Sequence, residues 1–324
     1  MFKNINNNQF FTLPVLDNRL HVIGEVDFEI NIITSFKGVT LEVGGDLETY
    51  WKSTAVSASQ TTSLAPPRTP RRPGHVGSVQ ASPVYTSSNG GPAQTLTISS
   101  LQGNYIYIVV QVTRDFHPVV YFDWLLPGIG FDLGIANITL TQYEDLAKSL
   151  GRDVNVKEGE RVDWAKMLPN KMVSLERLLR ILPPDINVLL DLAYPSESTL
   201  ELYNLHRLDL NNFVDSVLRT IFDASDLQDT QFMRRKISFA SFSADVCSAL
   251  NWKQPNYPVF FGTICGDEEA RLPTPTALGS GKDDKRAASV GAAVEFSKAN
   301  NLLGVFVDAH LLVSQPGETL CDRY

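Results

Sequence analysis

Single polar residues separate apolar ones near the start of the chain. Val26, Phe28, Ile30 and Ile32 follow this period-two pattern, which is typical of strands whose two faces differ in polarity. The pattern predicts a β-rich N-terminal region over residues 1–35. Further along, short runs rich in β-branched and aromatic residues predict six more strands, at residues 105–112, 119–121, 188–192, 237–242, 259–261 and 302–307.

Helical spacing appears between several of these runs. Leu175, Leu178, Leu179 and Leu182 form an i, i+3, i+4, i+7 stripe, which predicts an amphipathic helix. Thr141 and Glu144 have the spacing of a capping box and predict the start of another helix. A second apolar stripe consists of Phe213, Val214, Val217, Leu218 and Ile221.

Repetition of strand, helix and strand indicates an α/β fold in which helices cover parallel strands. With residues 39–43 as a first strand the pattern gives seven strands, one fewer than the eight that close a (β/α) barrel. We therefore expect a TIM-like barrel that is incomplete at its C-terminus, in a truncated chain. An open barrel, or closure by another segment, are the alternatives.

The composition changes abruptly after Trp51. Residues 55–95 are dominated by Ser, Thr, Pro and Gly, and such a segment buries too little apolar surface to offset the entropy lost on ordering. The sequence thus predicts a disordered linker between the first barrel strand region, residues 36–54, and the rest of the barrel, residues 96–324.

This linker is locally basic, since no Asp or Glu occurs between Glu48 and Asp115. The sequence TPRR that begins at Thr69 has the Thr-Pro-x-basic form phosphorylated by proline-directed, cyclin-dependent kinases, and Ser82, which precedes a proline, is a weaker candidate. An unmodified linker, kept soluble by its Pro and Arg residues, is the alternative.

The whole chain of 324 residues is acidic, with a formal net charge of −8 and a pI near 5.2. It lacks the diffuse positive field that would hold a nucleic acid backbone. No apolar run approaches the roughly 18–20 residues that cross a bilayer, and no secretory signal begins the chain, so we expect an intracellular protein without a membrane span. Cys247, Cys265 and Cys321 have no metal-binding spacing, and the first two are expected in the core.

Residues 105–127, YIYIVVQVTRDFHPVVYFDWLLP, resemble the core of the glycerophosphodiester phosphodiesterases. In that family a strand with Glu-x-Asp leads through a Thr-x-Asp turn to Pro-Val-Val-x-His-Asp. Residues 36–54, 131–147, 237–259 and 300–305 resemble one subgroup more closely, the fungal phosphate-starvation regulators. These join SPX, ankyrin and phosphodiesterase-like domains and act as cyclin-dependent kinase inhibitors.

The resemblance implies that several catalytic positions are replaced. The His-Arg-Gly of active relatives, whose His serves in acid–base chemistry, falls on the stretch that starts at Val43. The two acids that hold the divalent metal fall on Tyr107 and Val109, and neither can act as a carboxylate ligand.

The remaining catalytic positions are also changed. The second histidine falls on Phe122, which cannot transfer a proton, although the Asp that follows is kept as Asp123. The Glu-x-Lys pair of active relatives falls on Asp191 and Ala193. Asp123 and Asp191 are thus weak remnants of a metal site, and we expect Asp191 to be a structural acid paired with a basic residue.

From this pattern we expect no catalytic residue, no bound metal and no cofactor. The resemblance implies a regulatory or interaction module in intracellular phosphate signalling, with a protein partner such as a cyclin and cyclin-dependent kinase complex. One alternative is an active phosphodiesterase of lipid metabolism that releases glycerol 3-phosphate and an alcohol with Ca²⁺ or Mg²⁺, its site rebuilt from His117, Asp115 or Asp123. Another is a receptor that binds a glycerophosphodiester or phosphate without turnover.

Overall fold

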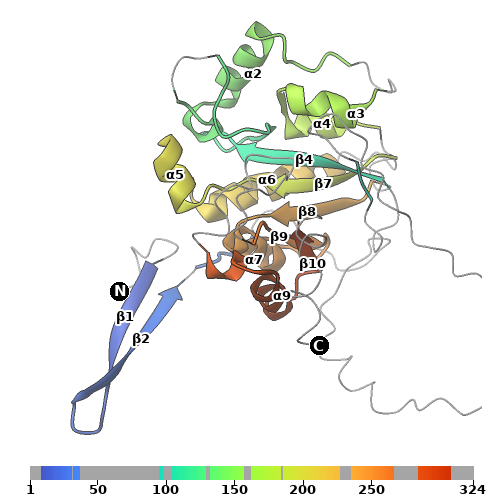
Figure 1. Cartoon of the computed structure of the whole chain (residues 1–324). Helices are drawn as coiled ribbons and strands as arrows, with labels where there is room; N and C mark the ends of the chain where they lie inside the picture. The colour runs from blue at the N-terminus through green and yellow to red at the C-terminus, as the bar shows by residue number, and fades with distance from the viewer. Residues whose placement is uncertain are drawn as a thin grey trace, which may run out of the picture.

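The structure is a computed structural model that describes residues 9–30, 32–36, 95–97, 104–128, 132–156, 162–183, 185–226, 235–265 and 284–307 (Figure 1). The expected strand at residues 39–43, the linker up to residue 94 and the C-terminal residues 308–324 lie outside these ranges. So do Val43, Thr69 and Ser82.

The N-terminal region is a β-hairpin, as the alternating pattern predicts. Strand β1 (Gln9–Leu16) pairs antiparallel with β2 (Val22–Ile30). The carboxylate of Asp17 closes the turn by accepting hydrogen bonds from the backbone N–H groups of Arg19 (2.7 Å) and His21 (2.9 Å). Among the described residues, no other strand pairs with this hairpin.

Five parallel strands form the centre of the main sheet, in the order β10-β9-β8-β7-β4 (Figure 1). Each overlaps a run predicted as a strand, so these five predictions are confirmed. The strands are β4 (Asn104–Val112), β7 (Asn187–Leu192), β8 (Ile237–Ser241), β9 (Val259–Thr263) and β10 (Gly304–Val307).

The strand predicted at residues 119–121 is present, but it is antiparallel and is not one of the parallel strands counted toward the barrel. Strand β5 (Pro118–Val120) runs antiparallel to β4 and continues the sheet to β6 (Val173–Ser174). The connection from β4 to β5 has only five residues, too few for the crossover that a parallel pair needs. The short strand β3 (Thr95–Thr97) also pairs antiparallel with β4, and it begins at the last residue of the expected linker.

Helices follow most of the strands. The leucines of the first predicted stripe lie in or next to α4 and are all buried, as are the five apolar residues of the second stripe in α6. The helices are α2 (Leu140–Ser149), α3 (Trp164–Met167), α4 (Leu175–Ile181), α5 (Glu197–Tyr203), α6 (Leu210–Asp226), α7 (Ala244–Lys253) and α9 (Val290–Ala299). Single 3₁₀ turns occur at η1 (Ile135–Asn137), η2 (Leu168–Asn170) and η5 (Lys285–Ala287).

Helix α2 begins two residues earlier than predicted, because a different capping box forms. The Thr139 hydroxyl accepts the N–H of Gln142 (3.4 Å), and the Gln142 side chain accepts the N–H of Thr139 (3.0 Å). The expected pair of Thr141 and Glu144 therefore lies inside the helix. Thr139 and Gln142 have the same spacing as the expected pair, so the spacing alone did not distinguish them.

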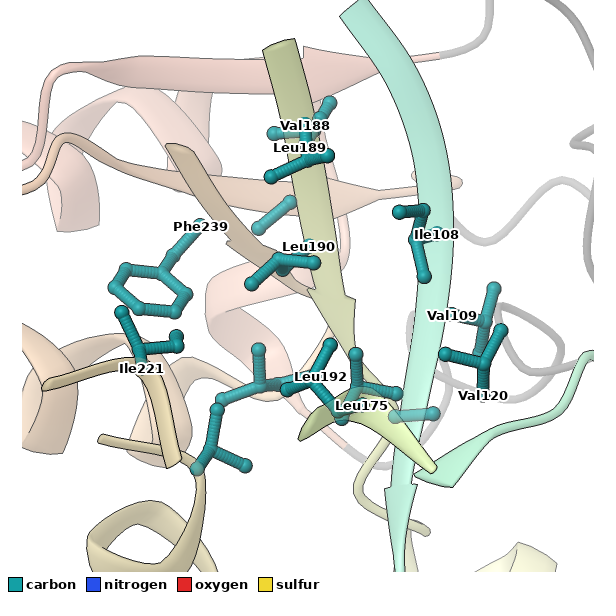
Figure 2. Packing of buried hydrophobic residues seen from close by; sticks show 14 of the residues in the cluster. Ile108, Val109, Val120, Leu175, Val188, Leu189, Leu190, Leu192, Ile221 and Phe239 are labelled. Atoms are coloured by element: carbon teal, nitrogen blue, oxygen red, sulfur yellow. The ribbon is translucent and has the colours of Figure 1, made fainter. Parts of the chain in front are cut away.

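The main core lies between the sheet and the helices that cover its outer face. Leu190 of β7 is paired in register with Ile108 of β4 and Phe239 of β8, so the three side chains share one face of the sheet. Figure 2 shows Leu190 and Phe239 packing near Ile221 of α6 and Leu175 of α4. The described strands and helices thus form part of a (β/α) barrel, with the other face of the sheet directed to the barrel interior.

A short extended segment, residues 32–36, connects the hairpin to the barrel. The side-chain amide of Asn211 donates to the carbonyl of Ile32 and accepts the N–H of Thr34, both at 3.0 Å. The ammonium of Lys253, which is fully buried, donates to the carbonyl of Thr34 and to Asp215, both at 2.8 Å. We call residues 32–36 the strap, and these contacts fix it to α6 and α7.

Among the described residues, no helix combines the length and the apolar character needed to cross a membrane.

Candidate functional site

The positions to which the resemblance assigns the metal-binding acids lie side by side on the inner face of the sheet. In the register of β4 and β7, Tyr107 is paired with Leu189 and Val109 with Asp191. Since side chains at paired positions point to the same face, Tyr107, Val109 and Asp191 all face the barrel interior. The structure therefore brings together the positions that the sequence identified on β4 and β7.

Tyr107 and Asp191 form a buried pair. The phenolic hydroxyl of Tyr107 donates a short hydrogen bond to Oδ2 of Asp191, whose residue is completely buried. The other carboxyl oxygen, Oδ1, is buried too and has no hydrogen-bond partner among the described residues. The expectation that a basic residue pairs with Asp191 is wrong, because a neutral hydroxyl on the adjacent strand takes that place.

Burial controls the protonation of Asp191. Desolvation raises the pKa of this carboxyl to about 7, and the hydrogen bond from Tyr107 offsets only part of the rise. Asp191 is therefore largely neutral in mildly acidic solution. A protonated carboxyl is a poor ligand for a hard cation, which favours ionised oxygen donors.

Aromatic rings fill the interior beside this pair. The ring of Phe306 on β10 stacks on Tyr107 with a centroid distance of 6.0 Å and an interplanar angle of 16°. Phe242 meets Phe306 edge to face at 6.2 Å. Gly262 on β9 makes room for this packing, because a Cβ there would lie 3.0 Å from two ring atoms of Phe242. The interior next to Asp191 is thus packed mainly by hydrocarbon.

Phe122 and Asp123 point to different surroundings. Phe122 is buried in the main hydrophobic core. Asp123 is exposed, and its carboxylate accepts the N–H of the next residue, Trp124, at 2.8 Å. No described contact joins Asp123 to Asp191, so the two remnant acids do not form one site.

His117 and Asp115 serve the hairpin turn between β4 and β5. His117 Nδ1 lies 3.4 Å from Asp115, and about half of its side chain is exposed. Asp115 also accepts hydrogen bonds from the Thr113 hydroxyl (2.6 Å) and from the N–H of Leu140 at the start of α2 (3.1 Å). Burial raises the pKa of Asp115, but these hydrogen bonds outweigh it and keep the pKa below its ordinary value. The structure assigns this cluster to turn and helix capping instead of a rebuilt catalytic site.

A shallow pocket lies at the carboxyl ends of β4 and β7. Ala193, the position of the family lysine, lines it together with Gln111, Trp124, Tyr194 and Phe213. The lining is mostly apolar and contains no Lys or Arg, and His206 is its one imidazole. Its walls come from segments that are far apart in the chain, so no local sequence pattern predicts the pocket.

Polar groups in the first turn of α7 find their hydrogen-bond partners within the protein. The Ser243 hydroxyl accepts the N–H of Val246, and Asp245 in the first turn accepts a hydrogen bond from Arg286 at 2.9 Å. Arg286 also binds Asp284 at 2.8 Å. Two carboxylates therefore neutralise this arginine at the carboxyl end of the sheet.

The residues at the positions to which the resemblance assigns the metal do not fit a divalent cation. They offer one buried carboxyl with a raised pKa, one phenol and one valine, whereas Ca²⁺ and Mg²⁺ take six or more oxygen ligands. Within the described ranges, no group of three or more His, Cys, Asp or Glu is placed to hold a metal ion.

Val43 lies outside the described residues, so the position assigned to the first catalytic histidine has no structural counterpart here. The sequence contains one His-x-Gly tripeptide, which begins at His75 and also lies outside the described ranges. Phe122, to which the resemblance assigns the second histidine, has no group that can accept or donate a proton.

Cys247 and Cys265 were both expected in the core, and the structure confirms this only for Cys247. Cys247 is fully buried, and burial raises the pKa of its thiol well above the ordinary range, as expected for a core residue. Cys265 is only half-buried, because it lies just past the end of β9 in a left-handed backbone conformation.

Comparison with known proteins shows the family to which this chain belongs. Residues 102–312 match the model of the Glycerophosphoryl diester phosphodiesterase family, and the chain belongs to this family.

Its relatives include both regulators and enzymes. The chain is 27% identical to ankyrin repeat protein nuc-2 of Neurospora crassa, covering 94% of this chain and 29% of that one. It is 26% identical to the phosphate system positive regulatory protein PHO81 of Saccharomyces cerevisiae, covering 96% of this chain and 26% of that one. It is also 24% identical to glycerophosphocholine phosphodiesterase GDE1 of Eremothecium gossypii, covering 94% and 25%. The chain thus spans between a quarter and three tenths of the length of these relatives.

Proposed function

We propose that this chain is a catalytically degenerate phosphodiesterase domain that serves as a regulatory or interaction module in intracellular phosphate signalling. One observation supports the proposal: Asp191 is buried and accepts a hydrogen bond from Tyr107, the residue that the resemblance aligns with a metal-binding acid of active relatives.

The energetics of catalysis support the loss of activity. A general acid or base typically contributes 10²–10⁴ in rate, and a metal acting as a Lewis acid stabilises the transition state by several kcal/mol more. In this chain Phe122 replaces a proton-transferring histidine, and Tyr107 and Val109 replace two metal ligands. Turnover should therefore fall below detection.

The relatives support the regulatory part of the proposal. One is named as a phosphate system regulatory protein and another as an ankyrin repeat protein, and both align with nearly the whole of this chain. A regulator acts through a protein partner, and a complex of a cyclin with its kinase is our candidate. Thr69 and Ser82 would be the sites at which such a kinase modifies the chain.

An active phosphodiesterase is the second candidate, because GDE1 is named as a glycerophosphocholine phosphodiesterase and aligns over the same region. Such an enzyme would need Ca²⁺ or Mg²⁺ and would release glycerol 3-phosphate. The retained Asp191 is the one described acid on which its metal site could depend.

Hydrolysis of glycerophosphocholine separates the two candidates. We expect no release of glycerol 3-phosphate by the purified chain with Ca²⁺ or Mg²⁺, measured beside an active relative such as GDE1. Turnover that Asp191→Asn abolishes would overturn the proposal. Tyr107→Phe, which keeps the ring and removes only the hydroxyl, should be as inactive as the unchanged chain.

A further inference from the structure

Two buried polar atoms on the inner face of the sheet have no hydrogen-bond partner among the described residues. One is Oδ1 of Asp191 on β7, and the other is the hydroxyl oxygen of Ser238 on β8. Asp191 is completely buried and Ser238 is 1% exposed, so bulk water reaches neither atom. Such atoms are rare in native proteins, because a polar group that leaves water without a new partner loses its hydrogen bonds.

The strand register places both atoms in the barrel interior. Ser238 is paired with Leu189 of β7, and Asp191 lies two residues after Leu189. Side chains two residues apart on a strand point to the same face, so Ser238 and Asp191 share the inner face of the sheet. Asp191 is itself paired with Ala240 of β8, which makes Ser238 its diagonal neighbour across the two strands.

The spacing of diagonal neighbours suits one small bridging molecule. Neighbouring strands lie about 4.8 Å apart and each residue rises about 3.3 Å, so the two Cα atoms are roughly 8 Å apart. A water bound to both oxygens spans up to about 5.6 Å, twice the roughly 2.8 Å of one O–H···O bond. The side chains of Asp191 and Ser238 span the rest. Ala240, opposite the acid, carries only a methyl group and occupies little of the space beside it.

The neighbouring side chains on the inner face do not supply the missing hydrogen bonds. The hydroxyl of Tyr107 is directed to the other carboxyl oxygen, Oδ2. Val109 and the ring of Phe306, which stacks on Tyr107, are hydrocarbon. A partner for Oδ1 and for the Ser238 hydroxyl must therefore be polar and small enough to fit between these groups.

We propose that one water molecule is bound inside the barrel between Oδ1 of Asp191 and the hydroxyl of Ser238. Water both donates and accepts hydrogen bonds, so it satisfies a carboxyl oxygen and a hydroxyl group together. Buried waters in proteins typically have roughly two to four polar partners, and this site offers two among the described residues. The inference goes beyond the proposed function, since the site holds solvent and neither a substrate nor a protein partner.

A crystal structure of the unchanged chain, at a resolution that shows ordered waters, tests the proposal directly. We expect one water within hydrogen-bond distance, about 3.2 Å or less, of both oxygens. A protein side chain between the two oxygens, a direct hydrogen bond from Ser238 to Asp191, or no density between them would overturn the proposal.

Magnetic relaxation dispersion of the water nuclei tests the proposal in solution, because it counts long-lived internal waters. Ser238→Val replaces the hydroxyl with methyl groups and should remove one such water. Ser216→Val is the matched control, since this serine on α6 is also buried and its hydroxyl donates to the carbonyl of Phe213 at 2.8 Å. It should leave the number unchanged.

Circular dichroism should show that both variants fold. Equal numbers of internal waters in the unchanged chain and in Ser238→Val would overturn the proposal, and so would the same loss in both variants. The crystal structure decides the question even where Ser238→Val does not fold, because it uses the unchanged chain.

Discussion

Tyr107 and Asp191, on adjacent parallel strands, share a buried hydrogen bond on the face of the sheet that is directed to the barrel interior. The phenol satisfies one oxygen of the acid, and the ring of Phe306 covers the phenol. The phenol and the acid are thereby part of the packed interior. The consequences of this packing are measurable without a substrate.

The first prediction concerns pH. Burial raises the pKa of Asp191 to about 7 in the folded state, against 3.8 for an ordinary aspartate. Between these values the folded chain binds more protons than the unfolded chain, so the contribution of Asp191 to stability is full below about pH 4 and is lost as the pH rises through 7. The loss should be on the order of 4 kcal/mol in total, at about 1.4 kcal/mol per pH unit.

Asp191→Asn provides the reference for this measurement, because an amide does not titrate. Urea unfolding from pH 4 to 8 should show that the free energy of unfolding of the unchanged chain falls relative to that of the variant. A difference between the two that stays constant with pH would contradict the raised pKa.

The second prediction concerns the aromatic packing. Gly262→Ala should lower the free energy of unfolding by about 1–3 kcal/mol, because the new methyl group meets the ring of Phe242 at 3.0 Å. Gly291→Ala in α9 is the matched control, with its nearest neighbour atom at 3.9 Å. It should be neutral or slightly stabilising. Equal effects of the two substitutions would show that the interior is not packed as described.

The third prediction concerns the strap. Lys253→Met removes the buried ammonium and leaves Asp215 without this partner, so it should cost about 2–4 kcal/mol of stability. Asp215→Asn in the same chain should recover part of the loss. A double-mutant cycle measured by chemical denaturation gives the coupling energy of the pair, and strictly additive costs would argue against a buried ion pair.

The helices and parallel strands could be predicted because their signals are local. The leucine stripe that starts at Leu175 has helical spacing and forms one apolar face, and its leucines are buried as that pattern predicts. The strand at residues 119–121 was also predicted, but its apolar pattern does not give its direction. The five-residue connection before Pro118 is the signal that favours an antiparallel pair.

The sequence predicted on which strands the residues of the candidate site lie, but it did not predict the contacts that they make. The motif resemblance placed Tyr107 and Val109 on one strand and Asp191 on another, and the register confirms that they share a face. The stacking of Phe306 on Tyr107 joins residues almost 200 positions apart, and no local pattern encodes such a contact. For the same reason the sequence suggested a basic partner for Asp191 where the structure has a phenol.

The fourth prediction concerns the linker. A cyclin-dependent kinase should phosphorylate the purified chain at Thr69, since the sequence TPRR fits its specificity, and Ser82 should be modified more slowly. Mass spectrometry of the treated chain, with Thr69→Ala as the control, checks this directly. Absence of modification at both sites would favour an unmodified linker.

The most direct test of the central claim is calorimetric titration of the purified chain with Ca²⁺ and with Mg²⁺. The account predicts no saturable binding, because Tyr107 and Val109 supply no carboxylate and Asp191 is buried in a hydrogen bond. Binding of one ion per chain that Asp191→Asn abolishes would contradict it.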